Sequence, residues 1–257
     1  MSQFNRRFFI TSAAAAAGLG LAGCVGSQNQ MAAAVPASGS PGSPNAQAVA
    51  DAGLESGSVD YRAMYAAIPD GQFTVPATSL SDINPAFLRK RVAYVTNEAP
   101  GTIIVDPANH YLYHVESGGK AMRYGVGVGR EGFAWSGEAR IKNKQEWPDW
   151  YPPQEMLDRR PDLKKVMVEL QSGIGMHGGP DNPLGARAMY LWQGNQDTLF
   201  RIHGTNEPKT IGTSGSSGCI RMVNQDAVDL YKATEPGTKV VVLGNIGMPP
   251  TAKVARS

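Results

Sequence analysis

Alternating apolar and polar positions dominate the chain from residue 101 to residue 244. Short apolar runs are separated by turns rich in Gly, Pro, Asn and Ser, which is the pattern of β-strands joined by hairpins. In residues 122–129, Tyr124, Val126 and Val128 fall on one face at a period of two, which predicts a half-buried strand. Further strands are predicted over residues 102–106, 111–115, 139–142, 189–192, 198–203 and 239–243.

One late segment of this region, residues 224–233, carries a clear helical pattern. It begins with Asn224, a residue type favoured at helix N-caps, and has Asp226 in its first turn. Val228 and Leu230 are available for burial. The order of elements therefore predicts a mainly β fold of mixed, mostly antiparallel sheets, arranged as a β-sandwich or compact barrel with one late α-helix.

Composition agrees with a β fold and excludes several classes of protein. The chain has 257 residues, of which 30 are Gly and 18 are Pro, and such turn-forming residues suit a β protein better than a helical bundle. The formal net charge is only +2 and no basic and aromatic stripe is present, so no nucleic acid is expected as a partner. No Cys-x-x-Cys or His-Glu-x-x-His pattern occurs, so we expect neither a metal nor a cofactor.

The N-terminus has the features of an exported bacterial protein. Residues 1–24 contain a twin-arginine start, an apolar run too short to span a bilayer, and the ending Leu-Ala-Gly-Cys at Cys24. This ending resembles a bacterial lipoprotein box, in which the cysteine is lipidated and becomes the mature N-terminus. An ordinary signal peptide is the alternative. We expect a periplasmic protein whose only contact with a membrane is a lipid anchor at Cys24.

The rest of the chain divides into four segments by composition. Residues 25–58, rich in Ala, Ser, Gly and Pro, predict a flexible linker. Residues 59–100 predict an N-terminal extension packed on the main domain, and residues 101–244 form that domain. Residues 245–257 remain as a C-terminal tail.

The segment from Ile202 to Met222, with the sequence IHGTNEPKTIGTSGSSGCIRM, carries the candidate chemistry. It places His203 at the end of a predicted strand and Cys219 sixteen residues later. An imidazole beside a cysteine can accept the thiol proton and so produce the nucleophilic thiolate. A buried structural cysteine with an unrelated surface histidine is the alternative, and such pairs are common by chance.

The residues around Cys219 have chemical uses of their own. Gly218 permits a tight turn in Ser-Ser-Gly-Cys, where successive backbone N–H groups can form an oxyanion hole. Ser216 and Ser217 are expected to support this turn. Arg221, two residues beyond Cys219, is expected to hold a substrate carboxylate with two parallel hydrogen bonds.

These residues resemble the signature of the bacterial L,D-transpeptidase catalytic domain, the cysteine peptidoglycan transpeptidases of ErfK/YbiS type. The shared pattern is His-Gly-Thr, a loop of this length, and Ser-x-Gly-Cys-Ile-Arg-Met. The resemblance covers residues 101–244 and includes residues 178–186, which are similar to the family's Pro-x-x-x-Pro-Leu-Gly segment. The usual form has His where this chain has Ser217, which leaves only a backbone amide to contribute at that position.

The resemblance implies acyl transfer on peptidoglycan stem peptides. The Cys219 thiolate would attack the diaminopimelate carbonyl of a tetrapeptide and expel the terminal D-alanine, with His203 as the base. The group that orients the base is typically a backbone carbonyl or a small hydroxyl, for which Gly204 and Thr205 are the local candidates. The acceptor amine would belong to a second stem, giving a 3–3 cross-link, or to an outer-membrane protein that becomes attached to the wall.

Two alternative functions remain open from the sequence. An L,D-carboxypeptidase would form the same acyl-enzyme and transfer it to water. A non-catalytic wall-binding lipoprotein would need neither nucleophile nor base, so the presence of His203, Cys219 and Arg221 together argues against it. Outside this segment, His177 is expected to be a solvated loop residue, and the cluster of Trp147, Trp150 and Tyr151 to form either a packed loop or a wall of the substrate cleft.

Overall fold

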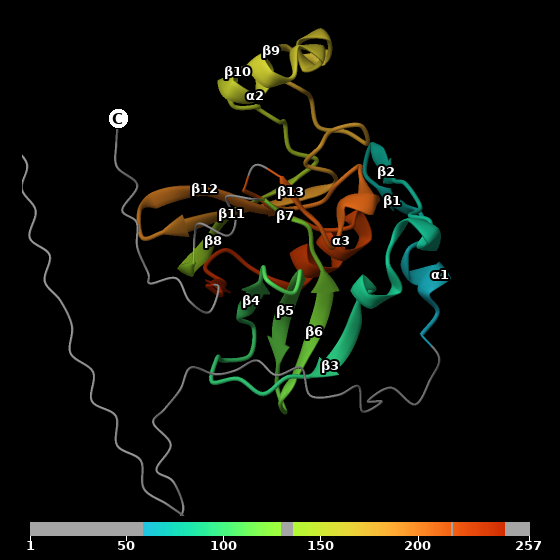
Figure 1. The fold of residues 1–257 in the computed structure, drawn as a ribbon, viewed down its shortest axis with the longest axis vertical. Helices are drawn as coiled ribbons and strands as arrows, with labels where there is room; N and C mark the ends of the chain where they lie inside the picture. Colours follow the sequence, from blue (N-terminus) through green and yellow to red (C-terminus); the bar gives the residue numbers. More distant parts are fainter. Residues whose placement is uncertain (1–58, 130–135, 217, 245–257) are drawn as a thin grey trace, which may run out of the picture. The chain divides into compact units, whose positions relative to one another are not determined.

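The structure is a computed structural model that describes residues 59–129, 136–216 and 218–244 (Figure 1). The predicted signal with Cys24, the linker 25–58, Ser217 and the tail 245–257 lie outside the described residues. Within the described ranges, no helix is long and apolar enough to cross a membrane.

A mixed sheet of nine strands is the framework of the described residues, in the order β14-β12-β11-β8-β15-β4-β5-β6-β3. Neighbouring strands are antiparallel except for the pairs β12–β14 and β15–β4, which are parallel. The strands are β3 Lys90–Ala93, β4 Ile103–Asp106, β5 Tyr111–Glu116, β6 Lys120–Gly125, β8 Gly137–Glu146, β11 Arg187–Gln193, β12 Gln196–His203, β14 Ile220–Arg221 and β15 Lys239–Val242.

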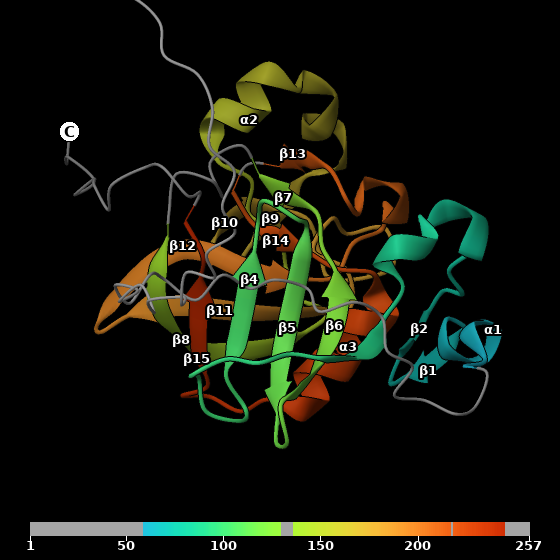
Figure 2. The same cartoon turned by 60° about the horizontal axis from the view of Figure 1, so that its bottom comes forward.

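The sheet bends into two layers, since β4, β5 and β6 run crosswise to β11 and β12 (Figure 2). Side chains of both layers meet in one core, with Ile103 and Leu112 on one side and Met189 and Ile202 on the other. The predicted β-sandwich is confirmed. The alternative of a barrel is wrong, because the end strands β14 and β3 pair with inner strands and not with each other.

Helix α3, Asn224–Ala233, occupies the predicted position and buries Val228 and Leu230. The predicted N-cap is wrong: the cap position is Val223, and no side chain caps the helix. The carboxamide of Asn224 instead accepts a hydrogen bond from the backbone N–H of Ala186 at 2.9 Å. The Asn224 side-chain oxygen therefore makes a tertiary hydrogen bond and does not cap the helix.

The predicted strand over residues 122–129 is divided in two. Strand β6 ends at Gly125, and Val128–Gly129 form the separate strand β7, which pairs with β13, Ser214–Ser216. Tyr124, Val126 and Val128 are nevertheless all buried in the main core, as their spacing predicts.

The extension packs against the main domain through α3. Tyr65 and Ile83 form a small apolar cluster with Ile211 and Val223, and β3 adds the last strand to the sheet. The extension's other elements are α1 Tyr61–Met64, β1 Ile68–Asp70, β2 Phe73–Val75, and the 3-10 turns η1 Leu80–Asp82 and η2 Pro85–Phe87.

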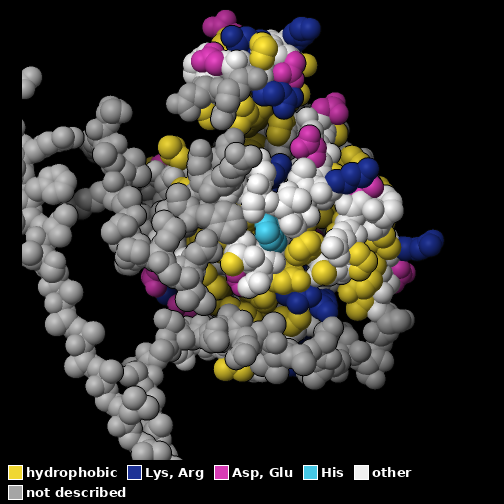
Figure 3. All heavy atoms as spheres, in the orientation of Figure 1, with side chains coloured by type: hydrophobic (Ala, Val, Ile, Leu, Met, Phe, Trp, Pro, Cys, Tyr) yellow, Lys and Arg dark blue, Asp and Glu magenta, His cyan; other side chains and the backbone are white. Residues whose placement is uncertain are grey.

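A lobe that the sequence pattern did not predict lies between β8 and β11, apart from the sheet (Figure 1). Acidic and basic side chains are interspersed on its surface (Figure 3). Its elements are α2 Gln154–Arg159, η4 Pro161–Val166, β9 Val168–Leu170 and β10 Gly173–Gly175. Outside this lobe, the 3-10 turn η5 Pro208–Thr210 follows β12.

Candidate active site

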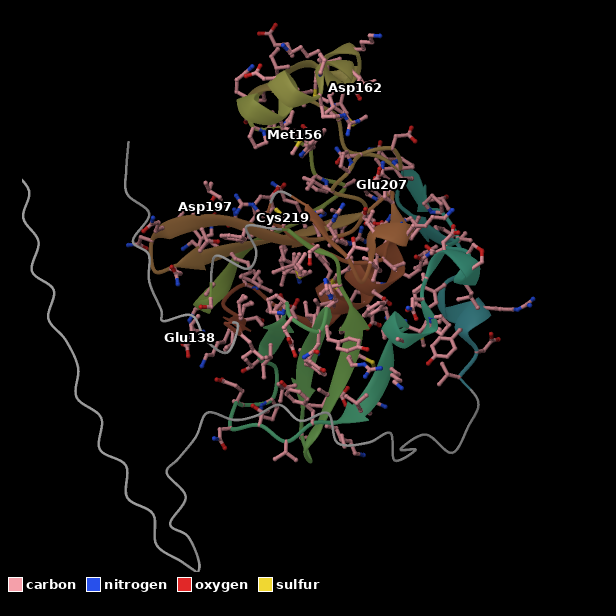
Figure 4. All side chains as sticks on the ribbon, viewed as in Figure 1. Glu138, Met156, Asp162, Asp197, Glu207 and Cys219 are labelled. Carbon is pink, nitrogen blue, oxygen red and sulfur yellow. The ribbon has the colours of Figure 1, made fainter. Side chains whose placement is uncertain are left out.

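The end of β12 and the short strand β14 bring the histidine and the cysteine together. Ile202 pairs with Ile220 in parallel register, and both side chains are buried in the main core. Because side chains alternate along a strand, His203 and Cys219 lie on the opposite face of the sheet. Cys219 directly precedes β14 and lies two positions before Arg221, the residue that pairs with His203. In Figure 4, Cys219 lies beneath the lobe that carries Met156 and Asp162.

His203 is held by the residue that follows it. Its side chain is 4% exposed, and its Nδ1 lies 2.5 Å from the carbonyl oxygen of Gly204. A carbonyl can only accept, so Nδ1 carries the proton and Nε2 has the lone pair that a base requires. The hydroxyl of Thr205, the other predicted candidate, accepts the N–H of Glu207 instead.

Burial sets the charge state of this imidazole. Desolvation lowers the pKa of His203 from 6.5 to about 4, although the hydrogen bond to the Gly204 carbonyl and the backbone of Leu184 oppose the shift. The positive charge of Arg221 lowers the pKa further. At neutral pH His203 is therefore uncharged and able to accept a proton.

The thiol of Cys219 is also uncharged at rest. Burial raises the pKa of Cys219, while a hydrogen bond from the Arg201 backbone amide and the charges of Arg201 and Arg221 act in the opposite direction. A neutral thiol and a neutral imidazole differ from the preformed ion pair of many reactive cysteines.

Arg201 and Tyr190 belong to the site and were missed by the sequence reasoning. Tyr190 pairs with Arg201 across β11 and β12, and the guanidinium carbon lies 4.5 Å from the phenol ring centroid. Arg201 also binds Asp197 through two hydrogen bonds of 2.7 and 2.8 Å. The predicted strand over residues 198–203 could have indicated Arg201, because alternate side chains of a strand share a face and Arg201 lies two positions before His203.

Arg221 lies beside the thiol, as its sequence position suggested. Its backbone exchanges hydrogen bonds of 2.7 and 2.9 Å with Gly127, and its side chain is 13% exposed. One guanidinium nitrogen lies 4.0 Å from Glu207, and Nε has no hydrogen-bond partner among the described residues. Burial lowers the pKa of Arg221, and the neighbouring Glu207 and Cys219 partly offset this.

The turn before the cysteine requires glycine. Gly218 has a φ of 119°, in a region that other residues rarely adopt. The backbone of Ser216 pairs with Gly129 in the β13–β7 ladder. Because Ser217 lies outside the described residues, the oxyanion-hole assignment stays a prediction.

The other candidate residues make contacts of their own. Trp147 packs on Phe73 and donates a hydrogen bond to Asp70, so it joins the extension to the main domain. The His177 side chain is 75% exposed and lies 3.7 Å from Asp149. Cavities of about 550 Å³ beside Trp192 and about 480 Å³ beside Trp147 contain neither His203 nor Cys219. Across the described ranges, no three His, Cys, Asp or Glu residues group as metal ligands would.

Fold and site together define a β-sandwich protein with a histidine–cysteine pair at one end of its sheet. Residues 100–242 match the family model of the L,D-transpeptidase catalytic domain (YkuD). This match covers more than half of the chain, which therefore belongs to the L,D-transpeptidase family.

Individual relatives cover parts of the chain. A putative L,D-transpeptidase in the ATP synthase subunits region of Fuscovulum blasticum is 36% identical over 108 residues, which are 42% of this chain and 49% of the relative. The probable L,D-transpeptidase ErfK/SrfK of Salmonella typhimurium is 31% identical over 146 residues, which are 55% of this chain and 43% of the relative. The chain thus spans less than half the length of these relatives.

A solved structure from Brucella melitensis, described as a probable carnitine operon oxidoreductase, is 49% identical to this chain. It covers 63% of this chain and 96% of its own, with a TM-score of 0.41.

Proposed function

We propose that this chain is a cysteine-dependent L,D-transpeptidase that acts on peptidoglycan tetrapeptide stems. The observation that supports it most directly is the His203 ring, whose proton is fixed on Nδ1 by the Gly204 carbonyl. The parallel pairing of His203 with Arg221, two residues beyond Cys219, also supports the proposal. Membership of the L,D-transpeptidase family supplies the class of substrate.

The first half-reaction forms a thioester. The Cys219 sulfur attacks the carbonyl carbon of the diaminopimelate residue while its proton passes to Nε2 of His203. When the tetrahedral intermediate collapses, the carbon–nitrogen bond to the terminal D-alanine breaks. The proton on His203 moves to the departing amine, so both His203 and the charge of the site return to their starting state.

The second half-reaction transfers the acyl group to an amine. The acceptor nitrogen attacks the thioester, its proton passes to His203, and the carbon–sulfur bond breaks to restore the thiol. An amine of a second stem gives a 3–3 cross-link, whereas an amine of an outer-membrane protein attaches that protein to the wall. Arg221 supports either outcome, since a partly buried guanidinium beside the thiol suits a stem carboxylate.

The backbone of Gly218 and Cys219 is the candidate for stabilising the oxyanion. The positive φ of Gly218 turns the chain just before the nucleophile, which allows successive N–H groups to converge on the attacked carbonyl oxygen.

Mass spectrometry of muropeptides tests this proposal. The full chain is incubated with a tetrapeptide substrate, with and without an acceptor stem, and D-alanine release and cross-linked product are quantified. We expect a 3–3 dimer with the acceptor present, and loss of at least about a thousandfold of the rate in Cys219→Ala. Free tripeptide as the only product would replace the proposal by an L,D-carboxypeptidase. Equal product from Cys219→Ala would refute the nucleophile.

A further inference from the structure

Asn224 packs against the backbone that surrounds the catalytic histidine. Its side chain oxygen Oδ1 accepts the N–H of Ala186 at 2.9 Å. A Cβ atom at Gly204 or at Gly185 would lie only 2.1 Å from this same oxygen. Both glycines therefore press their Cα atoms against the Asn224 carboxamide, where no other residue type fits.

Gly204 is the residue whose carbonyl accepts the Nδ1 proton of His203. Its own N–H donates to the carbonyl of Arg187 at 2.9 Å. With the N–H held by Arg187 and the Cα backed by Asn224, the Gly204 peptide is fixed on two sides. This leaves its carbonyl aimed at the imidazole.

The first turn of α3 holds Asn224 in place. Gln225 donates from Nε2 to the carbonyls of Tyr65, Ala66 and Pro76, and its Oε1 accepts from the Thr78 hydroxyl. The next residue, Asp226, accepts a hydrogen bond from the Tyr65 hydroxyl and lies 3.6 Å from the Arg89 guanidinium. The start of the helix is thus bound to the extension by buried polar contacts.

We propose that Asn224 is a positioning residue for His203. Its oxygen holds the Gly204 peptide so that the Gly204 carbonyl keeps His203 in the Nδ1–H tautomer and leaves Nε2 to accept the thiol proton. Asn224 acts through Gly204. The inference rests on the proposed role of His203 as the base, but the tautomer can be measured without any substrate.

A purely structural role for Asn224 makes a different prediction. If the side chain only satisfied the buried N–H of Ala186, its loss would lower the free energy of unfolding and leave the His203 tautomer unchanged. If it positions Gly204, its loss must also release the Nδ1 proton. The tautomer therefore separates the two roles.

The experiment compares Asn224→Ala with Asn224→Asp, which keeps an acceptor oxygen at the same place. Nitrogen NMR of the full chain with labelled histidine reports the tautomer of each ring, and His203→Gln assigns the His203 signal among the four histidines. Thr234→Ala is the matched control, because its buried hydroxyl bonds to Leu230 at the other end of α3.

We expect His203 to be protonated on Nδ1 in the wild type, in Asn224→Asp and in Thr234→Ala, and to populate both tautomers in Asn224→Ala. In parallel, kcat for D-alanine release should fall about tenfold in Asn224→Ala with KM unchanged. Gly204→Ala offers a second route if Asn224→Ala does not fold. Its added methyl collides with Oδ1, so it should shift the tautomer in the same way.

An unchanged tautomer in a folded Asn224→Ala or Gly204→Ala protein would overturn the inference, whatever the activity. A shifted tautomer in a protein whose wild type releases no D-alanine would support the positioning role and remove the proposed function. Failure of the positioning role and failure of the proposed function therefore give different results.

Discussion

At the scale of single residues, the histidine–cysteine pair works in a resting state without charge. Desolvation lowers the pKa of His203 and raises the pKa of Cys219, so burial disfavours both ions. A buried ion pair would need further hydrogen bonds to offset its desolvation. The neutral pair avoids this cost, and in the proposed reaction the two groups become charged only as the thiol attacks.

This resting state predicts a specific pH dependence of stability. The pKa of His203 is about 4 in the folded chain and about 6.5 when unfolded, so the unfolded state binds the proton more tightly. The contribution of His203 to stability is complete above pH 6.5 and is lost as the pH falls through about 4. Urea unfolding at a series of pH values should show this loss, on the order of 3 kcal/mol, in the wild type.

The matched comparison is His203→Gln, which cannot titrate in this range. Asp226, whose pKa burial raises from 3.8 to about 7, changes stability in the opposite direction, losing its contribution as the pH rises toward 7. Only the difference between wild type and variant therefore isolates His203. Parallel pH profiles for the two proteins would contradict a buried neutral imidazole.

The sequence predicts the residues of the histidine–cysteine motif but not the residues that pack around them. His203, Cys219 and Arg221 are visible because they share one segment, and the β12–β14 pairing keeps them near each other. Arg201 was missed because a charged strand residue usually faces solvent. Asn224 was misassigned because asparagine suits both a helix cap and a tertiary hydrogen bond, and only the fold decides between them.

At the scale of elements, local periodicity explains which parts were predictable. Seven strands of the sheet and α3 follow apolar patterns of period two or 3.6, so most of their residues are predicted, whereas the short strands β3 and β14 are not. The lobe from α2 to β10 has short elements and few buried side chains, and so leaves little periodic signal. The pairing of β3 with β6 joins distant segments, which local patterns do not report.

The contact between the extension and α3 gives a prediction for Gln225→Ala. The substitution leaves three buried or partly buried carbonyls without their donor, so the free energy of unfolding should fall by about 2–3 kcal/mol. Urea denaturation measures the change. Gln193→Ala is the control, because that exposed glutamine makes one hydrogen bond to the Glu138 carbonyl. Equal losses in the two variants would show that the extension adds nothing to the stability of the fold.

At the scale of the whole molecule, the proposed chemistry requires a periplasmic protein, and residues 1–24 supply the export hypothesis. We propose that the twin-arginine start directs export and that Cys24 carries a lipid. Residues 25–58 would then separate the folded domain from the membrane surface. The Leu-Ala-Gly-Cys ending of residues 1–24 supports this hypothesis.

Cell fractionation of a Cys24→Ser variant tests the anchor. A single thioether-linked lipid cannot form on serine, so the variant should move from the membrane fraction to the soluble periplasmic fraction. Cys219→Ser is the control and should stay with the membrane, because the second cysteine lies in the folded domain. Wild-type protein that is already soluble would point to an ordinary signal peptide.

The attachment of the extension to α3 also has a mechanical consequence. A protein fixed to a membrane at one end and acting on a rigid wall experiences tension along its chain. Such a pull enters the folded part at α1 and reaches Tyr65 and Gln225 before it reaches any strand of the nine-stranded sheet. The first contacts to bear the load are thus the ones that hold the start of α3, so under the proposed anchor a pull on the chain would loosen the support of the proposed base before the domain itself unfolds.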